Sequence, residues 1–316
     1  MALYLVTGGC GFIGGHLVER LLAEGHGVRV LDDLSTGKRD NIPSSVELLI
    51  ADTADPAALS AAFDGIDGCF HLAAIASVER CTREWAGSHR VNLTGTIAVF
   101  EAAARRRLQV VYTSSAAVYG AATEMPLHEA SRTKPISAYG ADKLGCELHA
   151  RVAGHVYGVP TAGIRPFNVY GPRQDPSSPY SGVISLFCRL IAEGRTLTIN
   201  GDGKQLRDFI YVDDIARAFI AAMRRANVEA PVYCACTGQA TSILDLAHLI
   251  GELYGKAPQI VFGEPRRGDV RTSLGDPARA RAELGFEAAV DLREGLRRTL
   301  AWAAAGSRSC PTAAMA

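Results

Sequence analysis

One stretch near the start of the chain constrains the fold more than any other: a short apolar run leads directly into a glycine-rich loop. The run is Leu3–Thr7, and the loop that follows reads Gly8-Gly9-Cys10-Gly11-Phe12-Ile13-Gly14. The next stretch, Phe12–Glu24, carries apolar residues at helical spacing. A buried strand, a tight glycine turn and a helix in this order are typical of the first unit of a parallel βαβ fold.

The spacing of the glycines indicates what such a unit binds. Gly9, Gly11 and Gly14 match the pattern G-x-G-x-x-G. Glycine is needed because the turn is tight, because the backbone must approach a pyrophosphate, and because the helix packs close to the strand. The helix N-terminus then offers free N–H groups and a partial positive charge to the phosphates. The sequence therefore predicts a dinucleotide site that includes Gly8, Gly11, Phe12, Ile13 and Gly14.

Two carboxylates favour one dinucleotide over another. Asp32 and Asp33 end the second apolar run, Val28–Leu31. A carboxylate at this position accepts hydrogen bonds from ribose hydroxyls and repels a 2′-phosphate, which favours NAD over NADP. Asp33 has an alternative interpretation as a solvated loop residue. Lys38 and Arg39 follow closely and keep the use of NADP open.

The alternation of apolar runs and amphipathic stretches predicts the fold class. Further short apolar runs are Val46–Ile50, Gly68–Leu72 and Leu108–Thr113, with helical patterns such as Leu93–Arg107 between them. Repeated βα units predict an α/β fold of the Rossmann type, with a doubly wound parallel sheet and helices on both faces.

The texture of the sequence changes after Phe167. Asn168–Gly182 is rich in Pro, Gly and Ser, and we expect it to form a long loop. We therefore predict an NAD-binding domain over residues 1–167 and a smaller C-terminal α/β domain over residues 168–316 that binds the substrate. Residues 208–236 contain two apolar pieces, Phe209–Ala222 and Val232–Cys236, and we expect them to return to the first sheet.

Three polar side chains predict proton-transfer chemistry. Tyr139 and Lys143 lie one turn apart in a predicted helix, so they share a face. A nearby ammonium lowers the pKa of a phenol, and we expect Tyr139 to act as a base near neutral pH for this reason. Ser115 follows the run Leu108–Thr113, at the sheet edge where ligands bind. Its hydroxyl can hydrogen-bond a substrate oxygen, and the alternative is a turn cap.

Composition excludes several classes of partner. Lys plus Arg and Asp plus Glu both number 33, so the chain has no basic excess for nucleic acid. It has no apolar run of roughly 18 residues, so we expect no membrane span, and its first residues resemble a strand rather than a signal peptide. The eight cysteines form no C-x-x-C and no pattern of metal ligands, which indicates a reducing cytoplasm and no metal site.

Four motifs together resemble the extended short-chain dehydrogenase/reductase family. They are TGGxGFIG at Thr7–Gly14, HLAA at His71–Ala74, SSAAVYG at Ser114–Gly120 and YGADK at Tyr139–Lys143. The resemblance extends to about Phe286. It implies NAD as the cofactor and Ser115, Tyr139 and Lys143 as catalytic residues. It also implies that the cofactor is lined by Asp52, Thr53, Leu72, Ala73, Ala74, Asn92, Tyr139 and Lys143.

Motifs in the second half resemble nucleoside-diphosphate-sugar epimerases within this family. The segments are Arg165–Asp175, Ile199–Asp214 and Arg266–Asp269. The resemblance implies a UDP-sugar substrate bound by Asn168, Thr198, Asn200, Arg207, Arg266 and Asp269. A guanidinium fork suits a diphosphate, and Arg267 could replace Arg266; the alternative is that these are surface arginines.

Ala116 and Ala117 favour the simplest reaction of the family. Related dehydratases and decarboxylases carry Asp or Glu beside the catalytic Ser or Thr, whereas both positions are alanine here. The sequence therefore favours 4-epimerisation of a UDP-hexose through a 4-keto intermediate. The alternatives are a 4,6-dehydratase, a uronate epimerase, a 4-keto-sugar reductase or, more remotely, a non-catalytic NAD-binding regulator.

The resemblance also implies features of the substrate and of the assembly. Ser77, Gln174 and Ser273 are similar to positions in epimerases that accept N-acetylated sugars, whereas Ala117 departs from them. We therefore expect UDP-N-acetylglucosamine and UDP-N-acetylgalactosamine to be accepted beside UDP-glucose and UDP-galactose; a turn cap is the alternative role of Ser273. The helices at Leu93–Arg107 and Tyr139–Tyr157 are expected to pair across a homodimer.

Overall fold

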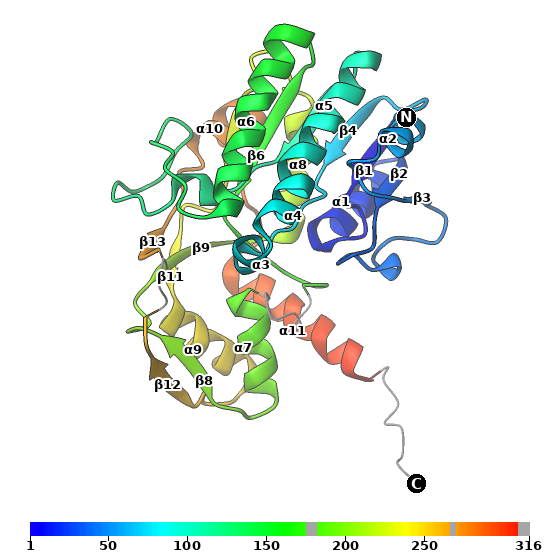
Figure 1. Cartoon of the computed structure of the whole chain (residues 1–316). Helices are drawn as coiled ribbons and strands as arrows, with labels where there is room; N and C mark the ends of the chain where they lie inside the picture. Colours follow the sequence, from blue (N-terminus) through cyan, green and yellow to red (C-terminus); the bar gives the residue numbers. More distant parts are fainter. Residues whose placement is uncertain (175–181, 266–269, 309–316) are drawn as a thin grey trace.

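A seven-stranded parallel sheet is the centre of the molecule. The computed structural model describes residues 1–174, 182–265 and 270–308. The strand order is β10-β6-β5-β4-β1-β2-β3, and every neighbouring pair is parallel (Figure 1). The strands are β1 (Leu3–Thr7), β2 (Gly27–Asp32), β3 (Glu47–Ile50), β4 (Gly68–His71), β5 (Val110–Thr113), β6 (Thr161–Pro166) and β10 (Val232–Ala235). The predicted Rossmann-type α/β fold is confirmed.

Helices cover both faces of this sheet and bury its apolar side chains. One face packs against α1 (Phe12–Ala23) and α8 (Val212–Met223), in a core that includes Leu17 and Phe219. The other face packs against α2 (Pro56–Ala62), α5 (Gly95–Arg106) and α6 (Ala138–Tyr157). The inner strands β4 and β5 are mostly apolar because both of their faces are covered, whereas the edge strand β3 is partly exposed.

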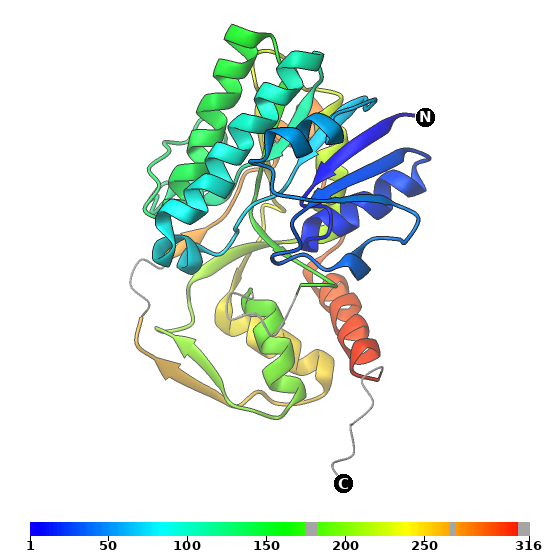
Figure 2. The ribbon, with the colours of Figure 1, turned by 45° about the vertical axis from the view of Figure 1, so that its right-hand side comes forward.

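A second, smaller set of strands carries the C-terminal part of the chain (Figure 2). Four strands form one sheet: β7 (Asn168–Tyr170), β9 (Leu206–Tyr211), β11 (Ala240–Ser242) and β13 (Thr272–Ser273). Two more, β8 (Leu197–Asn200) and β12 (Ile260–Gly263), pair in parallel. Helices α7 (Val183–Ala192), α9 (Ile243–Tyr254) and α11 (Leu292–Arg308) pack around them.

Two sequence-based expectations about this region need correction. Asn168–Gly182 does not form a loop throughout, because its first three residues pair with β9 as β7. Of the two pieces expected to return to the first sheet, Val232–Ala235 does so beside β6, and α8 packs against that sheet. The strand β9 instead belongs to the four-stranded sheet. Apolar content alone could not separate these cases, since both pieces are equally buried.

The remaining elements lie along the connections between the strands. They are η1 (Arg39–Asn41), α3 (Val78–Arg83), α4 (Trp85–His89), the π-helical turn η2 (Arg90–Thr94), η3 (Ala116–Tyr119) and α10 (Ala278–Leu284). Within the described ranges, none of the helices is long and apolar enough to cross a bilayer.

Candidate active site

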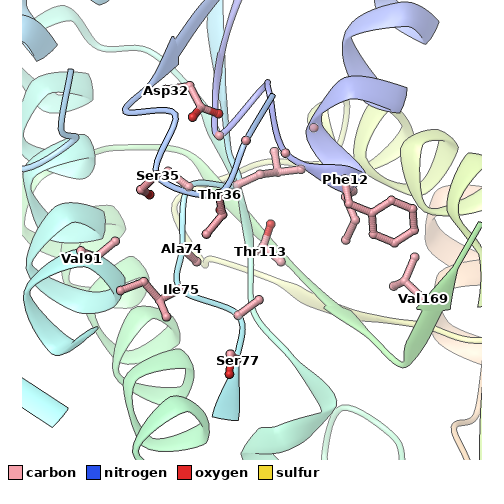
Figure 3. A pocket seen from close by; sticks show the side chains of 18 of the residues that line it. Phe12, Asp32, Ser35, Thr36, Ala74, Ile75, Ser77, Val91, Thr113 and Val169 are labelled. Atoms are coloured by element: carbon pink, nitrogen blue, oxygen red, sulfur yellow. The ribbon is translucent and has the colours of Figure 1, made fainter. Parts of the chain in front are cut away.

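A cleft of about 760 Å³ opens at the carboxyl ends of the parallel strands, where ligands bind in such sheets. In the view of Figure 3, Asp32 lies at one end of the cleft and Ser77 at the other, with Ala74 and Thr113 between them. The lining includes most of the predicted cofactor residues: Gly8, Gly11, Phe12, Ile13, Gly14, Asp32, Asp33, Asp52, Thr53, Leu72, Ala73, Ala74, Tyr139 and Lys143.

The glycine loop leaves no room for side chains. Gly8 has a φ of 68°, in the left-handed region, and a Cβ there would lie 2.6 Å from the Ala73 nitrogen. A Cβ on Gly14 would lie 2.1 Å from the Gly8 carbonyl oxygen. The backbone is thus bare where α1 begins, and this arrangement fits a pyrophosphate at the helix N-terminus.

Asp32 is held rigidly at the end of β2. Its two carboxylate oxygens accept hydrogen bonds from the backbone nitrogens of Cys10 and Leu34, each at 2.9 Å. Burial raises the pKa of this carboxyl, and the two backbone hydrogen bonds lower it. Asp33 is exposed and accepts hydrogen bonds from Ser35, so it lies at the rim of the cleft.

The segment after Asp33 lines the cleft and was only partly anticipated from the sequence. Its lining residues are Ser35, Thr36, Gly37, Lys38 and Asn41. The backbone nitrogen of Lys38 and the amide of Asn41 both donate to the Cys10 carbonyl, at 2.9 and 2.8 Å. The sequence offered one indication that this segment would line the cleft, namely its position directly after Asp32 and Asp33.

Asn92 does not line the cleft. It is fully buried, and its side chain accepts a hydrogen bond from the Ile75 nitrogen at 2.7 Å and donates to the Ile75 oxygen at 3.1 Å. Asn92 therefore holds the backbone of Ile75, the residue directly after Leu72–Ala74, without lining the cleft itself. Asp52 does line the cleft and forms an ion pair with Arg90 at 3.0 Å.

Ser115, Tyr139 and Lys143 meet at the base of the cleft. Ser115 forms a hydrogen bond with the Tyr139 side chain. The buried Lys143 ammonium donates to the Thr113 carbonyl at 2.8 Å and lies 5.9 Å from the centre of the Tyr139 ring. Ser115 also accepts a hydrogen bond from the Ala117 nitrogen, so the cap that was considered as an alternative role is present as well.

The expected lowering of the Tyr139 pKa is wrong. Burial raises the pKa of Tyr139 to about 12, although the Ser115 hydrogen bond lowers it. The Lys143 ammonium donates to the Thr113 carbonyl rather than to the Tyr139 hydroxyl. Burial also lowers the pKa of Lys143, while Cys146 and Asp142 nearby raise it.

A neutral histidine lies beneath the same site. His71 is buried at the end of β4, 2.7 Å from the Thr7 hydroxyl and 2.9 Å from the Thr96 hydroxyl. Thr96 donates to the Asn92 carbonyl, so the proton of the imidazole is assigned to the nitrogen that faces Thr96. Burial lowers the pKa of His71 to about 3, and the Lys143 charge adds to this effect.

A second cavity of about 320 Å³ adjoins Ser115 through Ala116 and Ala117. Arg207 and Ser273 line this cavity, whereas Ser77 and Gln174 line the larger cleft. Both alanines face the second cavity without any carboxylate among its lining residues in the described part of the chain.

Three predicted substrate residues lie elsewhere, and two are not described. Asn168 donates from its side chain to the Asp208 carbonyl at 2.9 Å. Thr198 and Asn200 lie on β8 and line neither cavity. Arg266 and Asp269 fall outside the residues that the structure describes.

Fold and site together define an α/β enzyme with a dinucleotide cleft and a serine, tyrosine and lysine at its base. Comparison with known proteins agrees: residues 4–235 match the model of the NAD dependent epimerase/dehydratase family. The chain belongs to this family, and NAD is its cofactor.

Several relatives are named as nucleotide-sugar epimerases, and a UDP-glucuronic acid decarboxylase of Xenopus tropicalis, 30% identical over 94% of this chain and 70% of that protein, also matches. The chain is 40% identical to a UDP-glucose 4-epimerase of Mycolicibacterium smegmatis, over 94% of this chain and 96% of that protein. The structure of a Thermotoga maritima UDP-glucose 4-epimerase with UDP-glucose superposes with a TM-score of 0.93 at 34% identity, covering 96% of this chain and 99% of that one. The structure of a UDP-N-acetylglucosamine 4-epimerase from Methanobrevibacter ruminantium, in complex with UDP-N-acetylmuramic acid, superposes with a TM-score of 0.92 at 34% identity. The superposition covers 96% of this chain and 99% of that one.

Proposed function

We propose that this enzyme interconverts the two C4 epimers of a UDP-hexose, UDP-glucose and UDP-galactose. The observation that carries the proposal is the meeting of Ser115, Tyr139 and Lys143 at the base of the NAD cleft, beside a second cavity with room for a sugar. The likeness to named UDP-glucose 4-epimerases over nearly the whole chain supports it.

The side chains would divide the work of proton transfer. Bound NAD supplies the hydride acceptor and donor for carbon 4 of the sugar. Tyr139 takes the proton from the 4-hydroxyl and later returns it to the same oxygen. Ser115 would hold that oxygen by a hydrogen bond, and the Lys143 ammonium lies over the face of the Tyr139 ring. Between the two proton transfers the 4-keto sugar would turn about its diphosphate, which Arg207 on the wall of the second cavity would hold.

The alanines beside Ser115 favour this reaction over a dehydration. A 4,6-dehydratase or a decarboxylase needs a further acid or base near carbons 5 and 6 of the sugar. Ala116 and Ala117 offer none, and the other described residues around the second cavity are apolar or carry hydroxyls, apart from Arg207.

The direct test uses the purified protein with UDP-glucose and no added cofactor. We expect UDP-galactose to form up to a constant ratio, without net change in absorbance at the wavelength of reduced nicotinamide. Net consumption of a reduced nucleotide would identify a reductase, and loss of water from the sugar would identify a dehydratase. The Tyr139→Phe variant serves as the inactive control.

We propose further that N-acetylated UDP-hexoses are substrates. Ser273 and Ala117 both line the second cavity, so no large side chain from these two positions fills it. The likeness to a UDP-N-acetylglucosamine 4-epimerase, which is 34% identical, as is the Thermotoga maritima UDP-glucose 4-epimerase, supports acceptance of the N-acetyl group.

A homodimer is proposed from an exposed apolar stripe on α6. Leu148, Val152 and Val156 follow each other at one-turn spacing and are 52%, 45% and 62% exposed. A second copy of the chain, packed through α5 and α6, would cover them. Val152→Glu should convert a dimer into a monomer in analytical ultracentrifugation, and a wild-type monomer would contradict the proposal.

The cysteines support a reducing compartment such as the cytoplasm. The seven cysteines in the part of the chain that the structure describes are all buried and none is in a disulfide. Such thiols suit a reducing environment.

A further inference from the structure

A buried ion pair lies directly behind the proposed catalytic side chains. Glu147 of α6 and Arg165 of β6 are 2% and 3% exposed in their side chains. Two parallel hydrogen bonds join them, from Arg165 Nε at 2.8 Å and from Arg165 Nη2 at 2.6 Å. A bidentate pair of this kind fixes both distance and orientation.

This pair connects the two elements that carry the catalytic groups. Glu147 lies one turn after Lys143 on α6, and it accepts a hydrogen bond from the Ser114 hydroxyl at 2.5 Å. Ser114 is the residue immediately before Ser115. The separation between the serine and the tyrosine–lysine helix is therefore bridged by one carboxylate.

Arg165 extends the same connection to the wall of the second cavity. Its guanidinium donates to the Tyr119 hydroxyl at 2.7 Å and to the Glu129 carbonyl at 3.2 Å. Tyr119 ends η3, which begins at Ala116 just after Ser115. The chain on both sides of Ser115 is thus tied to a single buried pair.

Stability alone gives little reason for such a pair. Replacing a buried ion pair by apolar side chains of similar size is often neutral or stabilising, because both charges must be desolvated. Apolar side chains fill the core beside it, as Val110, Val111 and Ile164 do on β5 and β6. The geometry of the reacting groups, by contrast, is sensitive to small displacements.

We propose that Glu147 and Arg165 form a positioning clamp that sets the distance of Ser115 from Tyr139 and Lys143. The clamp acts through Ser114 and Tyr119 and contacts neither substrate nor cofactor. The inference rests on the proposed function of the three catalytic residues.

Ser114→Ala is the sharpest probe, because it removes a single contact to the clamp and leaves the ion pair intact. We expect kcat for epimerisation to fall by roughly 10-fold to 100-fold while KM and NAD content stay near wild type. The acid limb of the pH–rate profile should move to higher pH, since a displaced Ser115 no longer lowers the pKa of Tyr139. Ser114→Thr keeps the hydroxyl and should restore much of the rate.

Ser88→Ala is the matched control. Ser88 is as fully buried as Ser114, and its hydroxyl donates to the backbone oxygen of Trp85 at 3.0 Å, away from the clamp. We expect Ser88→Ala to keep the wild-type kcat and pH profile even where it lowers the melting temperature.

A double variant tests the pair itself without leaving a lone buried charge. Glu147→Leu combined with Arg165→Met should fold and should show the same fall in kcat as Ser114→Ala. Wild-type kcat and pH profile in Ser114→Ala or in a folded double variant would overturn the clamp. A wild-type protein that epimerises no UDP-sugar would instead refute the proposed function, so the two failures are distinguishable.

Discussion

The two sides of the active site are built differently. The cofactor side consists of successive strand ends of one sheet, from Gly8 after β1 to Ala74 after β4, and each is positioned by its own βα unit. The proposed substrate side, the second cavity, is assembled from pieces far apart in the chain: η3, Arg207 of β9 and Ser273 of β13. The first side is therefore fixed by local geometry, whereas the second depends on how the small sheet docks against the large one.

This contrast predicts that backbone changes will be most damaging on the cofactor side. Gly14→Ala places a Cβ 2.1 Å from the Gly8 oxygen, so the loop must open. We expect the purified variant to contain almost no NAD, measured by chromatography after denaturation. Gly87→Ala is the control, because a Cβ there meets nothing within 4 Å and NAD content should not change.

The next largest effect is expected at Tyr139, at the base of the cleft. Tyr139→Phe removes the proton acceptor and keeps the ring, so turnover should fall by roughly 100-fold or more. NAD content and melting temperature should remain near wild type. Tyr157→Phe, on the exposed end of the same helix, should leave turnover unchanged. Turnover of Tyr139→Phe within a few-fold of wild type would show that Tyr139 is not the base.

Acid should weaken the cofactor side through His71. The folded-state pKa of His71 is about 3, below the usual value of 6.5, so the unfolded chain binds more protons between these values. The stability that neutral His71 allows is fully present above pH 6.5 and is lost as the pH falls towards 3, by about 1.4 kcal/mol per pH unit.

His71→Gln should flatten the pH dependence of the unfolding free energy in that window by about 1.4 kcal/mol per unit, measured by urea denaturation. His248→Gln is the control on the C-terminal side, because His248 is exposed on α9. An unchanged slope in His71→Gln would show that the histidine is not held neutral by its surroundings.

The same contrast explains what the sequence could and could not predict. The glycine loop and Asp32 are local patterns, and repeated βα units predicted a parallel, doubly wound sheet, although not its seven strands. Helical spacing placed Tyr139 and Lys143 on one face, but it could not reveal that the ammonium turns to the Thr113 carbonyl.

Local sequence patterns do not predict contacts between residues that are far apart in the chain. Glu147, Arg165 and Tyr119 are brought together from three elements, and nothing in their neighbourhoods in the sequence marks them as partners. The expectation that Phe209–Tyr211 would return to the first sheet failed for the same reason, since strand pairing is decided by tertiary packing.

The smallest expected effect is on the selectivity between N-acetylated and plain UDP-hexoses. It tests whether a single side chain of the second cavity decides which sugar is accepted. Ser273→Tyr adds a ring to the wall of the second cavity, which Ala116 and Ala117 also line. Filling a packed site costs about 1–3 kcal/mol, so UDP-N-acetylglucosamine should lose roughly 10-fold to 100-fold in kcat/KM. The kcat/KM for UDP-glucose, which is smaller at carbon 2, should change little.

Ser273→Ala is the matched control, because it removes the hydroxyl without filling the space and should keep both substrates. Equal losses on both sugars in Ser273→Tyr would mean that the ring disturbs the whole cavity. No turnover of the N-acetylated sugar by the wild type would leave an enzyme restricted to plain hexoses.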